Sequence, residues 1–249
     1  MKAFVLGAGA TGIADWSEAG EILSGARSLA DRVSPQPKIL PPAEQRRAAE
    51  SVRYALAAAD AAMTMSGLDR REVASVFTSS GGDGNTLHQI CEALAGTERT
   101  VSPTRFHNSV HNAAAGYWSI ACKSRAPSTT LCAYDASFAA GLLEAMSLVV
   151  VDRLSVLLVA FDCKYPEPLH ALRPAPVSFA AAFVLTHERT PKTIAEWNLD
   201  IRTGAAPEHN GIMLNASARA LPLLAALGRE KKVPLEYLPG QHVVVECTG

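Results

Sequence analysis

The stretch APSTTLCAYDASFAAGLLEA, residues 126–145, carries the strongest local pattern in the chain. Residues 129–134 predict a short strand, and residues 138–150 predict a helix that is apolar nearly all round. A helix of that kind is buried. Asp135 and Ser137 lie at the junction between strand and helix, where α/β folds expose side chains for chemistry. Both residues could instead simply cap the helix.

Further strands and helices alternate on both sides of this stretch. We expect strands at residues 2–6, 73–78, 155–162 and 178–186, and helices at 43–65, 86–94 and 112–122. Such alternation is typical of an α/β fold whose mainly parallel sheet is covered on both faces. The rest of the chain offers less: strands at 193–201 and 242–247, and a helix at 216–227.

The composition restricts the class of function. Lys and Arg number 23 against 24 Asp and Glu, so the charge balance does not suggest a nucleic-acid or membrane-surface protein. The longest apolar run, residues 142–151, is about half the length of a membrane-spanning helix. The N-terminal residues enter a strand without the apolar region of a signal peptide, which predicts a cytoplasmic location. Five widely spaced cysteines without a CxxC motif predict buried free thiols.

Two motifs could bind a small anion. Gly7, Gly9 and Gly12 match GxGxxG after a strand, and Asp31 follows at about the distance of a ribose-binding acid, as in dinucleotide-binding enzymes. A plain glycine turn is the expected alternative, because no convincing helix follows. The Gly-rich turn at residues 79–84 could present backbone N–H groups to an anion, although packing against a neighbouring strand is the simpler expectation.

His107 and His111 stand four residues apart, a spacing that puts metal ligands on one helix face. The residues between them supply no third ligand and no carboxylate lies near, so we expect a structural pair. We therefore predict neither a bound metal nor a cofactor.

Four segments occur in the order found in a known family. They are VFTSSGGDG (76–84), SPTRFHNSVHNAAAGYWSI (102–120), residues 126–145 quoted above, and FAAAFVL (179–185). Together they resemble the N-terminal half of the β-ketoacyl synthases over roughly residues 1–190. The resemblance implies an α/β, thiolase-like layered fold. We expect one domain over residues 1–249, with a complete N-terminal βα half (1–190) and a much reduced C-terminal βαβ extension (191–249).

The chain departs from this family where the chemistry occurs. Counted from Pro127, the nucleophilic cysteine of the family falls on Asp135. The family holds the growing acyl chain on its nucleophile as a thioester, which requires a thiolate, and a carboxylate cannot substitute for the thiolate. Ser137 is a weaker candidate, since no base accompanies it in the sequence. The family's two catalytic histidines, in His-Gly-Thr and Lys-x-x-x-Gly-His contexts, have no counterpart here.

The resemblance therefore implies a subunit that does not condense acyl groups by itself. It is similar to the chain-length factors and to the ketosynthase-like subunits of aryl polyene pathways. The partners so implied are a full-length β-ketoacyl synthase, or a second copy of this chain, and transiently an acyl carrier protein. Residues expected at the acyl tunnel or the interface are Phe106, His107, His111, Asn112 and Phe138.

Two further expectations follow. A small acid/base enzyme, a malonyl-thioester decarboxylase or hydrolase, could use Asp135 with His107 or His111. In addition, the short C-terminal part predicts that helix 138–150 is left partly uncovered in a monomer. The resemblance implies that the family's interface strand falls on residues 129–134, and association through this strand would then cover the helix.

Overall fold

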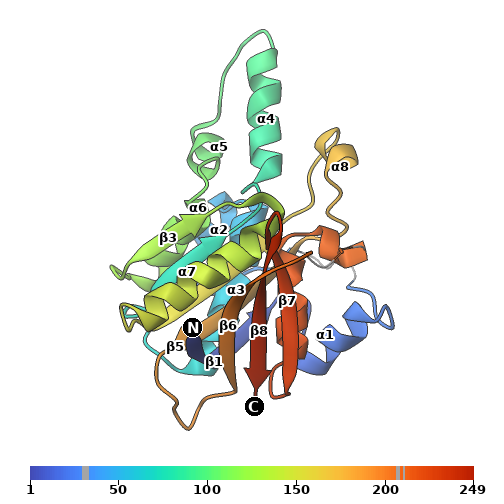
Figure 1. The fold of residues 1–249 in the computed structure, drawn as a ribbon. Coiled ribbons are helices and arrows are strands. Elements are labelled where there is room, and N and C mark those ends of the chain that lie inside the picture. The colour runs from blue at the N-terminus through green and yellow to red at the C-terminus, as the bar shows by residue number, and fades with distance from the viewer. Residues whose placement is uncertain (30–33, 206–207, 210) are drawn as a thin grey trace.

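One eight-stranded sheet runs through the computed structural model, which describes residues 1–29, 34–205, 208–209 and 211–249 (Figure 1). The strand order is β3-β2-β4-β5-β1-β6-β8-β7. The strands are β1 (Lys2–Ala10), β2 (Ala74–Thr78), β3 (Ser128–Leu131), β4 (Val156–Asp162), β5 (Phe179–Thr186), β6 (Ala195–Thr203), β7 (Lys231–Leu238) and β8 (Gln241–Thr248).

The expectation of a mainly parallel sheet is wrong. Only β2 pairs in parallel, with β3 on one side and β4 on the other, and the remaining pairs are antiparallel. A parallel connection needs a crossover of a dozen or more residues, usually a helix. Between β4 and β5 the chain forms only the four-residue helix α8 (Leu169–Leu172), so β5 returns antiparallel beside β4.

Helices cover both faces of the sheet. The α-helices, besides α8, are α1 (Trp16–Leu23), α2 (Pro42–Arg47), α3 (Glu50–Ser66), α4 (Gly84–Ala95), α5 (Pro103–Asn108), α6 (Ala113–Cys122), α7 (Ser137–Val150) and α9 (Leu221–Ala225). Short 3₁₀ turns are η1 (Tyr134–Ala136), η2 (Gly211–Leu214) and η3 (Ser217–Ala220). None of the helices within the described ranges is long and apolar enough to cross a bilayer.

Strand β4 shows how the two cores share the sheet. Leu157, Val159 and Phe161 point into one core, with α3 and α6, and the alternate residues point into the other, with α7, α1 and α9. All seven residues of β4 are buried. A strand covered on both faces reads as a continuous apolar run, which is the pattern in the sequence.

Several elements differ from the expectation. The helix expected at 43–65 is two helices, because the backbone at Ala48 is extended (ψ 128°) between α2 and α3. The helix expected at 216–227 is η3 followed by α9. Strand β7 and helices α1, α5 and α8 were not expected. Cys91 and Cys132 are exposed, so not all of the free thiols are buried.

Helix α7 is better covered than the sequence suggested. Its buried side includes Phe138, Leu142 and Met146, and the C-terminal strand β7 packs against it. Exposed apolar residues are limited to its last turn, where Val150 is 40% and the following Val151 is 77% exposed. The β6–β8–β7 end of the sheet therefore covers part of the apolar surface of α7 that we expected a second subunit to cover.

Two glycines of β1 allow α3 to lie directly on the strand. Gly7 and Gly9 are strand residues, and a Cβ on either would lie within 2.8 Å of a backbone nitrogen of α3. Only Gly12 has the positive φ of a turn residue (78°). The first two glycines of the GxGxxG match are thus packing residues and not a turn, and Asp31 lies outside the described residues.

We predict that Gly7→Ala lowers the free energy of unfolding by about 1–3 kcal/mol, because the new methyl group overpacks the β1–α3 contact. Gly20→Ala is the matched control. Gly20 lies in α1 with nothing within 4 Å of a built Cβ, and alanine favours a helix. Urea denaturation of both variants tests this. Equal stability of Gly7→Ala and the parent chain would contradict the packing argument.

Candidate functional site

The junction that carries Asp135 lies at the carboxyl ends of the parallel strands. Asp135 is in η1, between β3 and α7, and the preceding Tyr134 has a positive φ of 52°. The Thr78 hydroxyl, at the end of β2, donates to the Ser137 carbonyl at 2.7 Å. The Cys132 thiol donates to the Ser80 carbonyl at 3.1 Å. Neighbouring strand ends therefore hold the junction in place.

Two guanidinium groups contact the Asp135 side chain. Arg173 Nη2 lies 2.7 Å from Asp135 Oδ1, and Arg219 Nη2 lies 3.5 Å from Asp135 Oδ2. Arg219 Nη1 also donates to the Asp135 carbonyl at 2.6 Å. The Arg173 guanidinium is stacked over the Tyr134 ring, 3.5 Å from its centroid. Asp135 is thus an ion-paired carboxylate with both oxygens facing positive charge.

The ion pairs continue away from Asp135. The Arg219 side chain is only 6% exposed; it also pairs with Glu236 of β7 and donates to the Met213 carbonyl at 3.2 Å. His209 Nε2 lies 3.5 Å from Glu236 Oε2. Burial lowers the pKa of His209, and the Arg219 charge lowers it further. We call Asp135, Arg173, Arg219, Glu236 and His209 the charge network.

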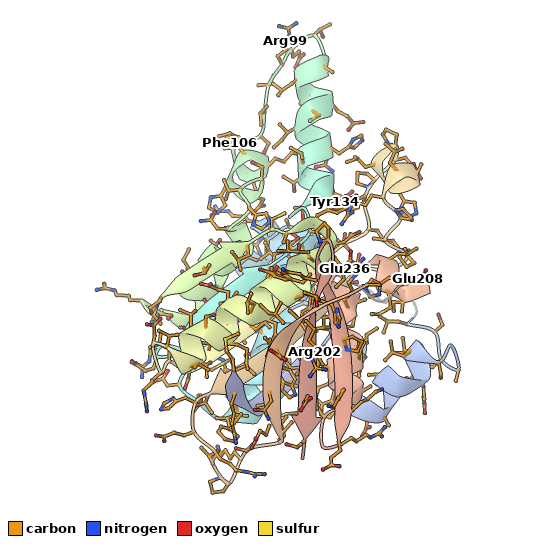
Figure 2. The ribbon with its side chains drawn as sticks, in the orientation of Figure 1. Arg99, Phe106, Tyr134, Arg202, Glu208 and Glu236 are labelled. Atoms are coloured by element: carbon orange, nitrogen blue, oxygen red, sulfur yellow. The ribbon has the colours of Figure 1, made fainter. Side chains whose placement is uncertain are left out.

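The sequence interpretation identified Asp135 but missed the other four members of the network. Arg219 left a usable signal, because it is the one charged residue of the otherwise apolar segment 216–227. A lone charge in such a segment is seldom buried without a partner. Arg173 and Glu236 gave no comparable signal. Figure 2 shows Tyr134 and Glu236 at the same end of the sheet, although a hundred residues separate them in the chain.

Ser137 has a structural environment. It is 1% exposed, and its hydroxyl donates to the Tyr134 carbonyl at 2.6 Å and accepts from the Ala133 N–H at 3.0 Å. These contacts fix the start of α7. No histidine or carboxylate is among the partners that the structure gives this hydroxyl.

The residues expected at a tunnel or interface lie in two places: four of them within residues 106–112, and Phe138 on α7. Phe106 is 68% exposed on α5, which projects with α4 beyond the end of the sheet (Figures 1 and 2). His107 contacts the Tyr117 ring edge-on at 5.8 Å, and Asn112 is exposed at the start of α6. Phe138 is buried against Phe183 in the core.

His111 is half-buried, and its Nε2 atom has no hydrogen-bond partner. No contact between described residues joins it or His107 to Asp135. Among the residues that the structure describes, no group of three or more His, Cys, Asp or Glu side chains could hold a metal ion.

The Gly-rich turn at 79–84 closes on a buried acid. Asp162 Oδ1 accepts from the Ser79 hydroxyl (3.1 Å), the Ser80 hydroxyl (2.7 Å) and the Ser80 N–H (2.8 Å). Burial raises the pKa of Asp162, although these hydrogen bonds oppose the shift. The Gly82 N–H donates to the Ser79 hydroxyl at 2.9 Å. The Ser80 and Gly82 N–H groups therefore already have partners within the fold, which favours a packed turn over an anion-binding one.

The sequence matches the family described as β-ketoacyl synthase, N-terminal domain, over residues 15–233. The chain belongs to this family. No curated protein matches it significantly.

Solved structures are similar over 81–100% of the chain. The ketosynthase ApeO in complex with its chain length factor ApeC, from Xenorhabdus doucetiae, aligns with a TM-score of 0.77 and 23% identity, covering 99% of each chain. The ishigamide ketosynthase/chain length factor aligns at 0.74 and 16%, covering 100% of each. A β-ketoacyl synthase from Burkholderia phymatum aligns at 0.63 and 14%, covering 81% of this chain and 64% of that one. The fold is therefore the thiolase-like fold of the ketosynthases.

We predict that Arg219→Met destabilises the chain by about 3 kcal/mol, because it leaves Asp135 and Glu236 facing each other without the buried cation between them. Both carboxylates are about a third exposed, so water relieves part of the cost. Arg71→Met is the control. It removes the exposed Arg71–Asp69 pair, and we expect no measurable change. Equal thermal stability of the two variants would contradict a structural role for the charge network.

Proposed function

We propose that this chain is a non-condensing, chain-length-factor-like subunit that pairs with an active β-ketoacyl synthase in polyketide- or fatty-acid-type biosynthesis. The aryl polyene pathways are the setting we favour. One observation carries the proposal: two arginines hold the carboxylate of Asp135, the residue on which the family's nucleophile falls by the resemblance.

Acyl transfer needs a nucleophile that attacks a thioester and is later expelled. A thiolate meets both needs, and a carboxylate meets neither well. The Asp135 side chain is also restrained by a charge-assisted hydrogen bond from Arg173 and by an ion pair with Arg219. The side chains that contact its carboxylate are the cations Arg173 and Arg219, so condensation by this chain alone is not expected.

The acid/base alternative gains no support from the geometry. A general base must lie within hydrogen-bond reach of the proton that it takes, and both Asp135 oxygens face guanidinium groups. His107 lies on α5 against Tyr117. The histidine of the charge network, His209, contacts Glu236 instead of Asp135. The geometry therefore supports the non-condensing role better than a decarboxylase or hydrolase activity.

The projecting part of the chain suits a protein partner. Helices α4 and α5 form an arm above the sheet with exposed apolar side chains (Figure 1). They are Leu87, Leu94 and Phe106, followed by Val110 just beyond α5. Apolar groups gathered on one projection mark an interaction surface. Strand β3 is also an edge strand: within the described residues it pairs with β2 on one side and with no strand on the other.

The similar structures point to the same class of partner. Two of them are complexes or pairs of a ketosynthase with a chain length factor. A third, AntDE:AntF, contains an acyl-carrier protein with its ketosynthase, at a TM-score of 0.75 and 14% identity. By analogy we propose a synthase as the stable partner, with an acyl carrier protein as a transient one, in the cytoplasm. Self-association is the other arrangement we consider.

We predict that the chain, co-expressed with a β-ketoacyl synthase from the same organism, purifies as a 1:1 heterodimer through a tag on one subunit. Phe106→Asp should weaken this heterodimer at least tenfold, because it puts a charge on the apolar arm. Ile201→Asp is the control. Ile201 is an exposed apolar residue of β6, and three strands separate β6 from β2, the strand that leads into the arm. Light scattering gives the stoichiometry. A monodisperse monomer that ignores the synthase would contradict the proposed role.

A further inference from the structure

The two arginines of the charge network come from segments that are separate in the chain. Arg173 directly follows α8 in the Pro-rich loop 166–176, and Arg219 lies in η3. Their guanidinium groups meet at one carboxylate, on opposite oxygens. A carboxylate held by two cations from distant segments has the arrangement of a bound ligand, although here it belongs to the chain itself.

The surroundings favour an anion at this point. Arg219 is almost fully buried, and a buried charge must be paired. Glu236 offsets one positive charge, and Asp135 offsets the other. The start of α7 adds the partial positive charge of a helix N-terminus. Without the Asp135 side chain, two cations and a helix end would face one vacant, carboxylate-sized space.

That space would be open to solvent. The Asp135 side chain is 34% exposed, and Tyr134, over which Arg173 stacks, is 61% exposed. A small carboxylate could therefore reach the guanidinium groups without unfolding the chain.

We propose that Arg173 and Arg219 form a binding site for a small carboxylate, which Asp135 fills as an internal ligand. The internal ligand closes the site to external acids. It also fastens the loop 166–176 and the β7 end of the sheet to the start of α7, through Arg173 and through Arg219 with Glu236. This inference concerns the site itself and does not depend on which protein the chain pairs with.

The test is rescue of Asp135→Ala by sodium acetate. The melting temperature of this variant is measured in acetate and in chloride at equal ionic strength. With a Kd on the order of 10 mM, about 100 mM acetate should raise it by roughly 3 °C more than chloride does. The parent chain, whose site is filled, should respond equally to the two salts.

Three controls identify the source of any response. Asp135→Asn keeps the space filled and should show no preference for acetate. Asp135→Ala combined with Arg173→Ala should lose the acetate response, because one of the two cations is gone. Asp69→Ala frees the exposed Arg71 and should show no acetate response, because one mobile surface cation does not make a site.

Hydrogen exchange gives a second readout. Amides of the loop 166–176 should exchange faster in Asp135→Ala, and acetate should slow them again. If Asp135→Ala is recovered only as aggregate, the yield of soluble protein after refolding is compared between acetate and chloride. Recovery specific to acetate supports the site. Equal failure in both salts overturns it, as does an acetate response no larger than that of the parent chain.

Discussion

The buried guanidinium of Arg219 is the constraint on which the arrangement around the junction depends. A charge with 6% of its side chain exposed cannot be left unpaired, so its partners must be brought to it from elsewhere in the chain. They are the Asp135 side chain and carbonyl, Glu236 and the Met213 carbonyl. Because these partners belong to η1, β7 and η2, the C-terminal part of the chain is joined to the elbow, by which we mean the junction at residues 132–136 between β3 and α7.

The same contacts link the fold to the chemistry. In this family the elbow holds the group that carries the acyl chain, as the resemblance implies. Here the elbow holds an anion whose charge is needed to balance Arg219 and Arg173. A residue with that structural role is poorly suited to leave its partners and attack a thioester. Under the proposed function, the same ion pairs that hold Asp135 in place would also keep it from acting as a nucleophile.

Much of the fold could be predicted from the sequence, and the misses have physical reasons. Strand β4 was visible because it is covered on both faces, and helix α7 because its sequence is apolar nearly all round. Strand β7 was missed because Lys231, Lys232 and Pro234 break its pattern, and an edge strand tolerates such residues. Arg219 and Asp135 are 84 residues apart, so no local pattern could pair them.

The central claim is that position 135 carries a fixed carboxylate and no acyl group. Mass spectrometry of the intact subunits tests it most directly, after incubation with an acyl-coenzyme A or acyl carrier donor, for the chain alone and for the chain with its synthase. The account predicts an acyl adduct on the synthase and none on this chain. A stable adduct mapped to Asp135 or Ser137 would contradict it.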